Sequence, residues 1–227
     1  MTDRHAREAP AFLRTGPVVR QRMGKRLFDL VVASICLLVL SPLLLLAGVL
    51  VRATTPGQAL FRQTRVGRYG RPFVLYKFRT MYADSADDIH REYVRRLLVE
   101  DQPPVGGERG LYKLEADPRV TPVGRILRRT SIDELPQLFN VIRGDMSLVG
   151  PRPALPWEVE LFGPAHHQRC VVMPGMTGLW QVSGRNSLTM RQGLVLDLEY
   201  VEKQTFALDL AILLKTVPAV FTTSGAR

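Results

Sequence analysis

Residues 27–51 read LFDLVVASICLLVLSPLLLLAGVLV, and this apolar run decides the class of fold. Its one charged residue, Asp29, lies near its start. About 20 consecutive apolar residues are enough to cross a bilayer, so the run predicts a membrane helix. It is longer than the apolar core of a secretory signal, and no small-residue cleavage site closes it, so we do not interpret it as a signal peptide.

Two features bear on how this helix meets the membrane. Ser41–Pro42 lies near its middle, where proline removes a backbone donor and kinks or breaks a helix. The flanks carry equal positive charge, with seven Lys or Arg in residues 1–26 and seven in residues 52–79. Because positive charge marks the cytoplasmic side, this pattern fits a segment that turns inside the membrane and returns to the same face. An ordinary kinked spanning helix remains open as the alternative.

The composition limits the partners of the chain. Lys and Arg number 31 against 21 Asp and Glu, a net charge of +10, which suits a lipid surface, a nucleic acid or a phosphorylated substrate. The basic residues are spread among Gly- and Pro-rich loops and follow no recognition motif, so no nucleic-acid partner is expected. Cys36 and Cys170 are too few for a disulfide framework, and no cysteine cluster or histidine set predicts zinc.

The rest of the chain predicts a helix-rich α+β domain. Residues 1–22 are polar and basic and predict a flexible arm. The apolar tail at residues 206–221 is too short for a span, and it is either a core helix or an amphipathic helix on the membrane surface. Hydrophobic spacing and turn residues predict a strand at residues 73–78, helices at 84–99, 131–142 and 188–203, and loops at 101–110, 144–156 and 173–187.

The segment RILRRTSIDELPQLFNVIRGDMSLVGPRP, residues 125–153, holds the densest chemistry. Two neighbouring carboxylates, Asp133 and Glu134, follow a cluster of arginines. Ser131 with Glu134 matches a capping box, and alternatively Asp133 itself caps the helix. In both versions the carboxylates lie at a helix N-terminus, where the macrodipole favours anions. Helix capping alone would account for such a pair.

The surroundings of the acidic pair favour phosphate chemistry. Arg152 lies between Pro151 and Pro153, which hold it in a position to grip a phosphate. Carboxylates among arginines suit phosphoryl transfer with Mg²⁺, in which one carboxylate attacks phosphorus and the other holds the metal. The sequence contains no GxGxxG or Walker loop for a nucleotide, and no Gly-x-Ser-x-Gly of a serine hydrolase.

The chain resembles the monotopic phosphoglycosyl transferases, the bacterial sugar transferase family, over nearly its whole length from about residue 23. The motifs that carry the resemblance are long, specific and in the same order. They are KRLFDL (25–30), the Ser41–Pro42 pair, FRQTRVG (61–67), YKFRTM (76–81), DPRVTPVGRILRRTSIDELPQLFNVIRGDMSLVGPRP (117–153), MPGMTGLWQVSGR (173–185) and the stretch from DLEYVE to LDLAILLKTV (197–217).

The resemblance implies a topology and a location. Residues 23–52 are expected to form a re-entrant helix–break–helix in the membrane, with Ser41 and Pro42 at the break. Residues 53–227 are expected to form a small catalytic domain with membrane-interface helices, on the cytosolic face of the bacterial inner membrane. Membrane lipids are therefore expected partners, and a homodimer is compatible with the sequence.

The resemblance also implies a reaction. In the family, the aspartate of the acidic pair attacks the β-phosphate of a UDP-sugar and UMP leaves. Polyprenyl (undecaprenyl) phosphate then takes the sugar phosphate from the aspartate. By matching motif, Asp133 is the nucleophile and Glu134 is the Mg²⁺ ligand. The motif positions expected to serve the phosphates and the nucleotide are Arg128, Arg152, Arg185, Lys77, Arg79 and Asp197.

The expected donor is a hexose derivative. Residues 84–113 resemble the branch of the family that transfers hexose 1-phosphates, such as glucose or galactose, to start exopolysaccharide or glycoconjugate assembly. The alternative is a catalytically silent membrane scaffold of a polysaccharide assembly complex. A silent scaffold predicts loss of the acidic pair, yet Asp133 and Glu134 are both present.

Overall fold

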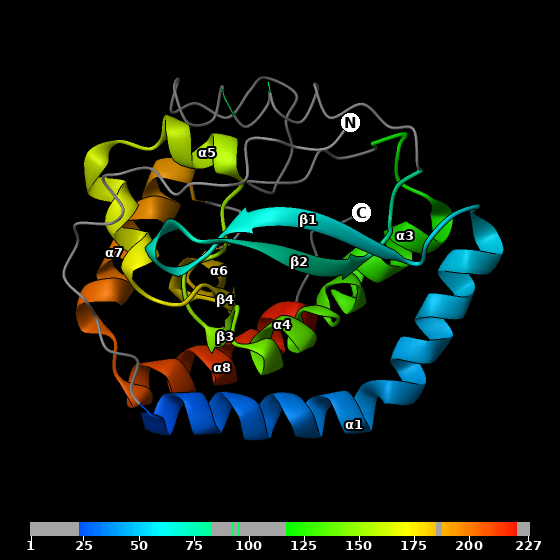
Figure 1. Cartoon of the computed structure of the whole chain (residues 1–227), viewed down its shortest axis with the longest axis horizontal. Coiled ribbons are helices and arrows are strands. Elements are labelled where there is room, and N and C mark those ends of the chain that lie inside the picture. The colour runs from blue at the N-terminus through cyan, green and yellow to red at the C-terminus, as the bar shows by residue number, and fades with distance from the viewer. Residues whose placement is uncertain (1–22, 83–91, 93–94, 96–116, 185–187, 222–227) are drawn as a thin grey trace.

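The computed structural model describes residues 23–82, 92, 95, 117–184 and 188–221 (Figure 1). The expected arm at residues 1–22 and loop at 101–110, and the helix at 84–99 apart from residues 92 and 95, lie outside this part. The elements are α1 (Met23–Thr54), β1 (Leu60–Val66), η3 (Arg68–Gly70), β2 (Pro72–Phe78), α3 (Pro122–Arg129), η4 (Ile132–Glu134), α4 (Gln137–Arg143), β3 (Ser147–Val149), α5 (Pro156–Leu161), η5 (Pro164–Val171), β4 (Gly175–Thr177), α6 (Leu179–Val182), α7 (Met190–Lys203) and α8 (Phe206–Phe221).

Helix α1 is continuous through Pro42 but strongly bent. It runs along one side of the molecule and then turns toward β1 and α3 (Figure 1). Pro42 lacks the N–H that would donate to the carbonyl of Leu38, and the hydroxyl of Ser41 donates to that carbonyl instead, at 2.8 Å. Residues 23–54 are therefore assigned to one bent helix, and the re-entrant topology expected around Ser41–Pro42 stays a prediction.

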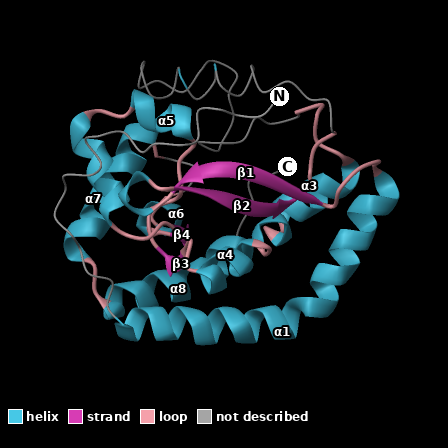
Figure 2. Ribbon diagram, viewed as in Figure 1, coloured by secondary structure: helices cyan, strands magenta, loops and turns pink. Residues whose placement is uncertain are grey.

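Two small sheets lie among the helices (Figure 2). Strands β1 and β2 pair antiparallel, with Leu60 opposite Phe78 and Val66 opposite Pro72, which confirms the strand expected at residues 73–78. Strands β3 and β4 pair parallel, with Ser147 opposite Gly175. Residues 144–156 and 173–187 therefore contain paired strands where loops were expected, because these three-residue strands form only when two distant segments meet.

The predicted helix at residues 131–142 is divided. Ile132–Glu134 forms a 3₁₀ turn, and the α-helix starts at Gln137 after Pro136, which has no N–H to continue the ladder. Ser131 adopts a left-handed backbone (φ 57°) and makes no side-chain capping bond in the described structure. The interpretation of Ser131 with Glu134 as a capping box is therefore wrong, and the N-cap of α4 is Pro136, with Asp133 inside the 3₁₀ turn before it.

The helices at the end of the chain match their expected ranges closely. The helix expected at 188–203 is α7, and the apolar tail forms α8. Ile212 and Asp209 of α8 are buried against the core, whereas Leu214 and Val217 on the same helix are exposed. Helix α8 therefore packs on the body with one face, as a core helix would, and presents an apolar face outward, while its location on a membrane surface stays a prediction.

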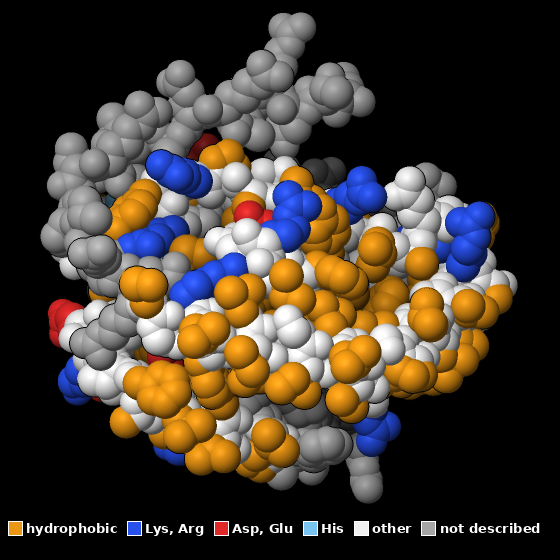
Figure 3. All heavy atoms as spheres, turned by 60° about the horizontal axis from the view of Figure 1, so that its bottom comes forward, with side chains coloured by type: hydrophobic (Ala, Val, Ile, Leu, Met, Phe, Trp, Pro, Cys, Tyr) orange, Lys and Arg blue, Asp and Glu red, His pale blue; other side chains and the backbone are white. Residues whose placement is uncertain are grey.

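A broad apolar surface covers the side of the molecule formed by α1 and α8 (Figure 3). Within the described residues, α1 is the one helix long and apolar enough to cross a membrane, with a mean hydropathy of 2.8 in its most apolar window. Only 11% of that window is buried inside the molecule, so it is not the core helix of a soluble domain. The most exposed large apolar side chains here are Met23, Leu27, Leu38, Val39, Leu45 and Val49 of α1, and Leu214 and Val217 of α8.

Candidate active site

Asp133 lies at the centre of a tight turn between α3 and α4. The left-handed backbone of Ser131 reverses the chain after α3, and Glu134 and Leu135 then donate their backbone N–H groups to Ser131 and Ile132. The side chain of Asp133 is buried, with 8% of the residue exposed, whereas Glu134 is half-buried. The turn thus places one carboxylate inside the protein and its neighbour at the surface.

Three cationic side chains converge on a pocket near this turn. Arg65 comes from β1, Lys77 from β2, and Arg152 from the loop after β3. The pKa of Lys77 is lowered to about 8. Burial is the largest cause, the charges of Arg152 and Arg65 act in the same direction, and Glu134 and Asp133 act in the opposite one. Positive charge therefore prevails, as expected of a site for an anion. The pocket is lined by Arg65, Leu75, Lys77, Gln137, Arg152, Pro153, Gly175 and Met176.

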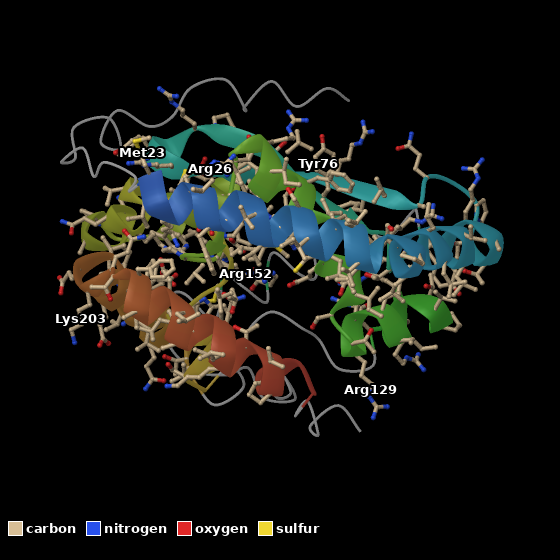
Figure 4. The ribbon with its side chains drawn as sticks, turned by 90° about the horizontal axis from the view of Figure 1, so that it is seen from below. Met23, Arg26, Tyr76, Arg129, Arg152 and Lys203 are labelled. Carbon is tan, nitrogen blue, oxygen red and sulfur yellow. The ribbon has the colours of Figure 1, made fainter. Side chains whose placement is uncertain are left out.

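Arg152 joins the pocket to the acidic pair. Its Nη1 lies 3.7 Å from Oε1 of Glu134, and both side chains are about one-fifth exposed. Seen from below, Arg152 lies between the ribbons of α1 and α8 (Figure 4). A half-buried guanidinium beside a carboxylate can bind a phosphate oxygen, and its contact with the carboxylate keeps it at a fixed distance from the acidic pair.

Arg128, in the last turn of α3, faces the same acidic pair. Burial lowers the pKa of Arg128, and the nearby charge of Asp133 is the largest influence that raises it. The buried ion pair of Asp117 with Arg119, at 2.7 Å, also acts on Arg128. The sequence-predicted residues Lys77, Arg128, Asp133, Glu134 and Arg152 are therefore brought together in one site.

Two other predicted residues are engaged elsewhere, and a third cannot be placed. Arg79 donates to the backbone carbonyl and hydroxyl of Thr55, at 2.8 and 2.7 Å, and so ties the end of β2 to the end of α1. Asp197 is buried on α7 and pairs with Arg169. Burial raises the pKa of Asp197 to about 6 despite that partner. Arg185 lies outside the described residues.

Sequence reasoning missed three residues of this region. Arg65 and Gln137 line the pocket, and Arg169 contacts the backbone of Arg152. A signal existed for Arg65 and Gln137, because both lie inside quoted motifs, FRQTRVG and the 117–153 segment. Arg169 lies four residues before MPGMTG, and nothing in its local sequence marks it as a neighbour of Arg152.

The donor set is compatible with magnesium when substrate phosphates share the coordination. Among the described residues, no group of three His, Cys, Asp or Glu side chains could hold a metal by itself. Mg²⁺ in phosphoryl-transfer sites is commonly held by one or two carboxylates, with water and substrate phosphates completing the octahedron. Glu134, half-buried beside Asp133, offers such a carboxylate.

Sequence comparisons agree with this geometry. The family model described as bacterial sugar transferase matches residues 20–223. The exopolysaccharide production protein ExoY of Rhizobium meliloti is 43% identical over 205 residues, which cover 90% of this chain and 88% of the relative.

Two further relatives carry names that specify a reaction. The undecaprenyl-phosphate galactose phosphotransferase of Salmonella typhimurium is 43% identical over 90% of this chain and 42% of its own length. The UDP-glucose:undecaprenyl-phosphate glucose-1-phosphate transferase of Caulobacter vibrioides is 42% identical over 92% of this chain and 74% of its own length. Galactose and glucose relatives are thus equally similar, so identity alone does not select a sugar.

Proposed function

We propose that this chain, which belongs to the bacterial sugar transferase family, transfers a sugar 1-phosphate from a UDP-sugar to undecaprenyl phosphate. The chain is a phosphoglycosyl transferase, as supported by the names of relatives that are 42–43% identical over about nine-tenths of the chain. The similarity to an exopolysaccharide production protein supports a place at the start of exopolysaccharide assembly. The proposed donors are UDP-glucose and UDP-galactose.

Asp133 is the proposed nucleophile. In the first step, one of its carboxylate oxygens forms a bond to the β-phosphorus of the UDP-sugar. The bond from that phosphorus to the oxygen bridging the two phosphates breaks, and UMP leaves with the electron pair. In the second step, a phosphate oxygen of undecaprenyl phosphate attacks the same phosphorus. The bond to Asp133 then breaks, which restores the carboxylate and releases the lipid diphosphate sugar.

The cations around Asp133 suit both steps. Lys77, Arg128 and Arg152 can neutralise the non-bridging phosphate oxygens, whose charge otherwise repels an attacking carboxylate. Glu134 is the proposed ligand of Mg²⁺, which when bound would supply further neutralisation of the donor diphosphate.

The apolar surface of α1 and α8 supports a membrane location. We infer that α1, which is bent and has Pro42 in its interior, dips into the cytoplasmic membrane and returns to the cytosolic face. The exposed apolar side chains of α8 would lie in the same interface. This arrangement brings the acidic pair to the level where the phosphate of a polyprenyl lipid meets a soluble nucleotide sugar.

The observation that carries the proposal is a buried carboxylate, Asp133, surrounded by cations in a chain of this family. The test is UMP release by purified protein in detergent with Mg²⁺, undecaprenyl phosphate and either UDP-glucose or UDP-galactose. The wild type should turn over, and Asp133→Asn should lower the rate at least about 1,000-fold. Asp145→Asn is a matched control, because Asp145 lies in the same segment but binds Asn140 and Arg143.

Each outcome of that assay is informative. Turnover with one donor only would identify the sugar. No UMP release by the wild type with any UDP-sugar would contradict the proposed reaction and favour the silent scaffold. Full activity of Asp133→Asn would contradict the nucleophile assignment while leaving the reaction itself in place.

A further inference from the structure

The loop that carries Arg152 is held by its backbone carbonyls. Pro151 and Pro153 on either side of Arg152 have no N–H, so this stretch can be fixed mainly through its acceptors. Donors from α1, β1, η5, β4 and α7 reach the carbonyls of residues 149–154, which comprise the end of β3 and this loop. The bonds are Lys25 and Tyr200 to Val149 (both 3.1 Å), Gly175 to Pro151 (2.9 Å), Arg169 to Arg152 (2.7 Å), Arg65 to Pro153 (3.0 Å) and Val66 to Ala154 (2.9 Å).

The bond to Arg152 itself comes from a buried ion pair. Nη2 of Arg169, on η5, donates both to the carbonyl of Arg152 and to the carboxylate of Asp197, on α7. Arg169 is 5% exposed and Asp197 is 1% exposed. The guanidinium carbon of Arg169 also lies 5.3 Å from the ring centre of Phe162. The Arg169 guanidinium thus contacts Asp197 and Phe162, and it donates a hydrogen bond to the backbone carbonyl of Arg152.

We propose that Arg169, oriented by Asp197, is a positioning residue that sets where the Arg152 guanidinium meets the substrate phosphate. This inference builds on the proposed function, because Arg152 is the residue through which Arg169 acts. It also gives Asp197 a role different from the one its motif position suggested. Asp197 orients Arg169 and does not bind the nucleotide.

The energetics of the Arg169–Asp197 ion pair favour a role in positioning Arg152 over a role in stability. Burying an ion pair removes two charges from water, and the attraction between them often fails to offset that loss. The raised pKa of Asp197, about 6, shows that desolvation outweighs the charge of Arg169 there. A well-packed apolar pair could therefore fill the same space without loss of stability. Such a pair could not donate to the Arg152 carbonyl, and this difference makes the role testable.

The first test is a double-mutant cycle on kcat/KM for UMP release. Arg169→Lys should lower kcat/KM by about 10- to 100-fold, since a small displacement of a positioned group has an effect of that size. Arg68→Lys is the matched control, because Arg68 is half-buried and also donates to a backbone carbonyl, that of Val171, outside this loop. This control should change kcat/KM by no more than about twofold.

The cycle separates positioning from general structure. In an Arg152→Lys background, Arg169→Lys should have less than about threefold further effect, because its action passes through Arg152. If the fall in kcat/KM of the double variant equals the product of the two single falls, the two residues act independently and the proposal is overturned. An Arg169→Lys enzyme with wild-type kcat/KM would overturn it too. An inactive wild type would instead count against the proposed function, so the two failures are distinguishable.

The second test removes the risk that Arg169→Lys unfolds the protein. The double variant Arg169→Met/Asp197→Leu replaces the pair by apolar side chains and should keep the thermal unfolding midpoint near that of the wild type. Its kcat/KM should still fall by about 10- to 100-fold, because no donor reaches the Arg152 carbonyl. A folded double variant with wild-type activity would overturn the positioning role.

Discussion

At the scale of single residues, the site combines a buried anion with an excess of cations. Asp133 is nearly buried, and the charges of Lys77, Arg128 and Arg152 lie close to the acidic pair that it forms with Glu134. The same cations repel one another when no substrate is present. Binding of a diphosphate would relieve that repulsion, which gives the site a preference for the donor substrate.

Lys77 should give the enzyme an alkaline limit. Its pKa is lowered to about 8, so the side chain is protonated below that pH and loses its charge as the pH rises through it. If the charge helps to bind the donor, kcat/KM for the UDP-sugar should fall about tenfold per pH unit above pH 8. Arginine stays charged above pH 8, so kcat/KM of Lys77→Arg should not fall in that pH range, even if its value is lower than that of the wild type at every pH. The same fall in both enzymes would contradict the assignment.

Sequence motifs predicted well which residues lie near the site. They predicted less well which way each side chain points. Asp133, Glu134, Arg128, Arg152 and Lys77 meet as expected. Arg79 lies only two residues from Lys77 on the sequence, yet its guanidinium turns to Thr55 at the end of α1. That direction depends on where a distant helix ends, which a local motif does not record.

At the scale of elements, the side chain of Asn140 joins α4 to the β1–β2 sheet. Its amide nitrogen donates to the carbonyl of Val74 at 2.7 Å, and its amide oxygen accepts from the N–H of Tyr76 at 3.1 Å. The amide thus pairs with the outer edge of β2 as a neighbouring strand would, and it covers an edge that would otherwise remain open.

Asn140→Leu should therefore be strongly destabilising although it keeps the volume of the side chain nearly constant. The substitution removes two half-buried hydrogen bonds, to the backbone of Val74 and of Tyr76, at about 0.5–1.5 kcal/mol each. Thermal or denaturant unfolding in detergent should show this loss. Gln58→Leu is a control, because Gln58 is exposed in the segment between α1 and β1 and should change stability little. An unchanged midpoint in Asn140→Leu would contradict the role of the amide.

The bend of α1 leads to a prediction about topology. If the helix returns to the face from which it entered, Pro10→Cys and Gln58→Cys, placed on either side of it, should both react with a membrane-impermeant thiol reagent from the cytosolic side. The experiment needs Cys36 and Cys170 replaced by alanine first. Labelling of the two positions from opposite sides would show that α1 spans the membrane.

The long, periodic elements could be predicted from the sequence, and the short ones could not. The apolar run, α7 and α8 each carry their own pattern. Strands β3 and β4 have three residues each and depend on contact between Gly150 and Gly175, where a Cβ on Gly175 would lie 2.1 Å from the Gly150 nitrogen. Glycine and proline predict a loop locally, although here the glycines permit two backbones to touch.

At the scale of the whole molecule, a buried polar cluster ties the long apolar helix α1 to the body that carries the acidic pair. Nζ of Lys25, at the start of α1, lies 2.7 Å from Asp209 of α8 and also donates to Val149 of β3. The hydroxyl of Tyr200 on α7 donates to the same two residues. Asp29 accepts from the hydroxyl of Ser147 at 2.7 Å. Helices α1, α7 and α8 and strand β3, which precedes Arg152, are therefore linked by buried hydrogen bonds.

Breaking this cluster on one side should destabilise the whole protein. Lys25→Met leaves Asp209 as a buried charge without its cation, which costs about 3–5 kcal/mol, whereas Lys25→Met/Asp209→Leu should recover most of that loss. The exposed pair of Lys203 with Glu199 is the control, and Lys203→Met should leave the unfolding midpoint unchanged. Equal midpoints for the single and double variants at Lys25 would contradict this account.

The central claim is that Asp133 carries the sugar phosphate. Intact-protein mass spectrometry tests it most directly, after the protein is mixed with Mg²⁺ and its UDP-sugar in the absence of undecaprenyl phosphate. The account predicts that wild-type protein gains the mass of one hexose phosphate, loses it when undecaprenyl phosphate is added, and that Asp133→Asn gains nothing. An active wild type that never carries the added mass, or an Asp133→Asn protein that does, would contradict the claim.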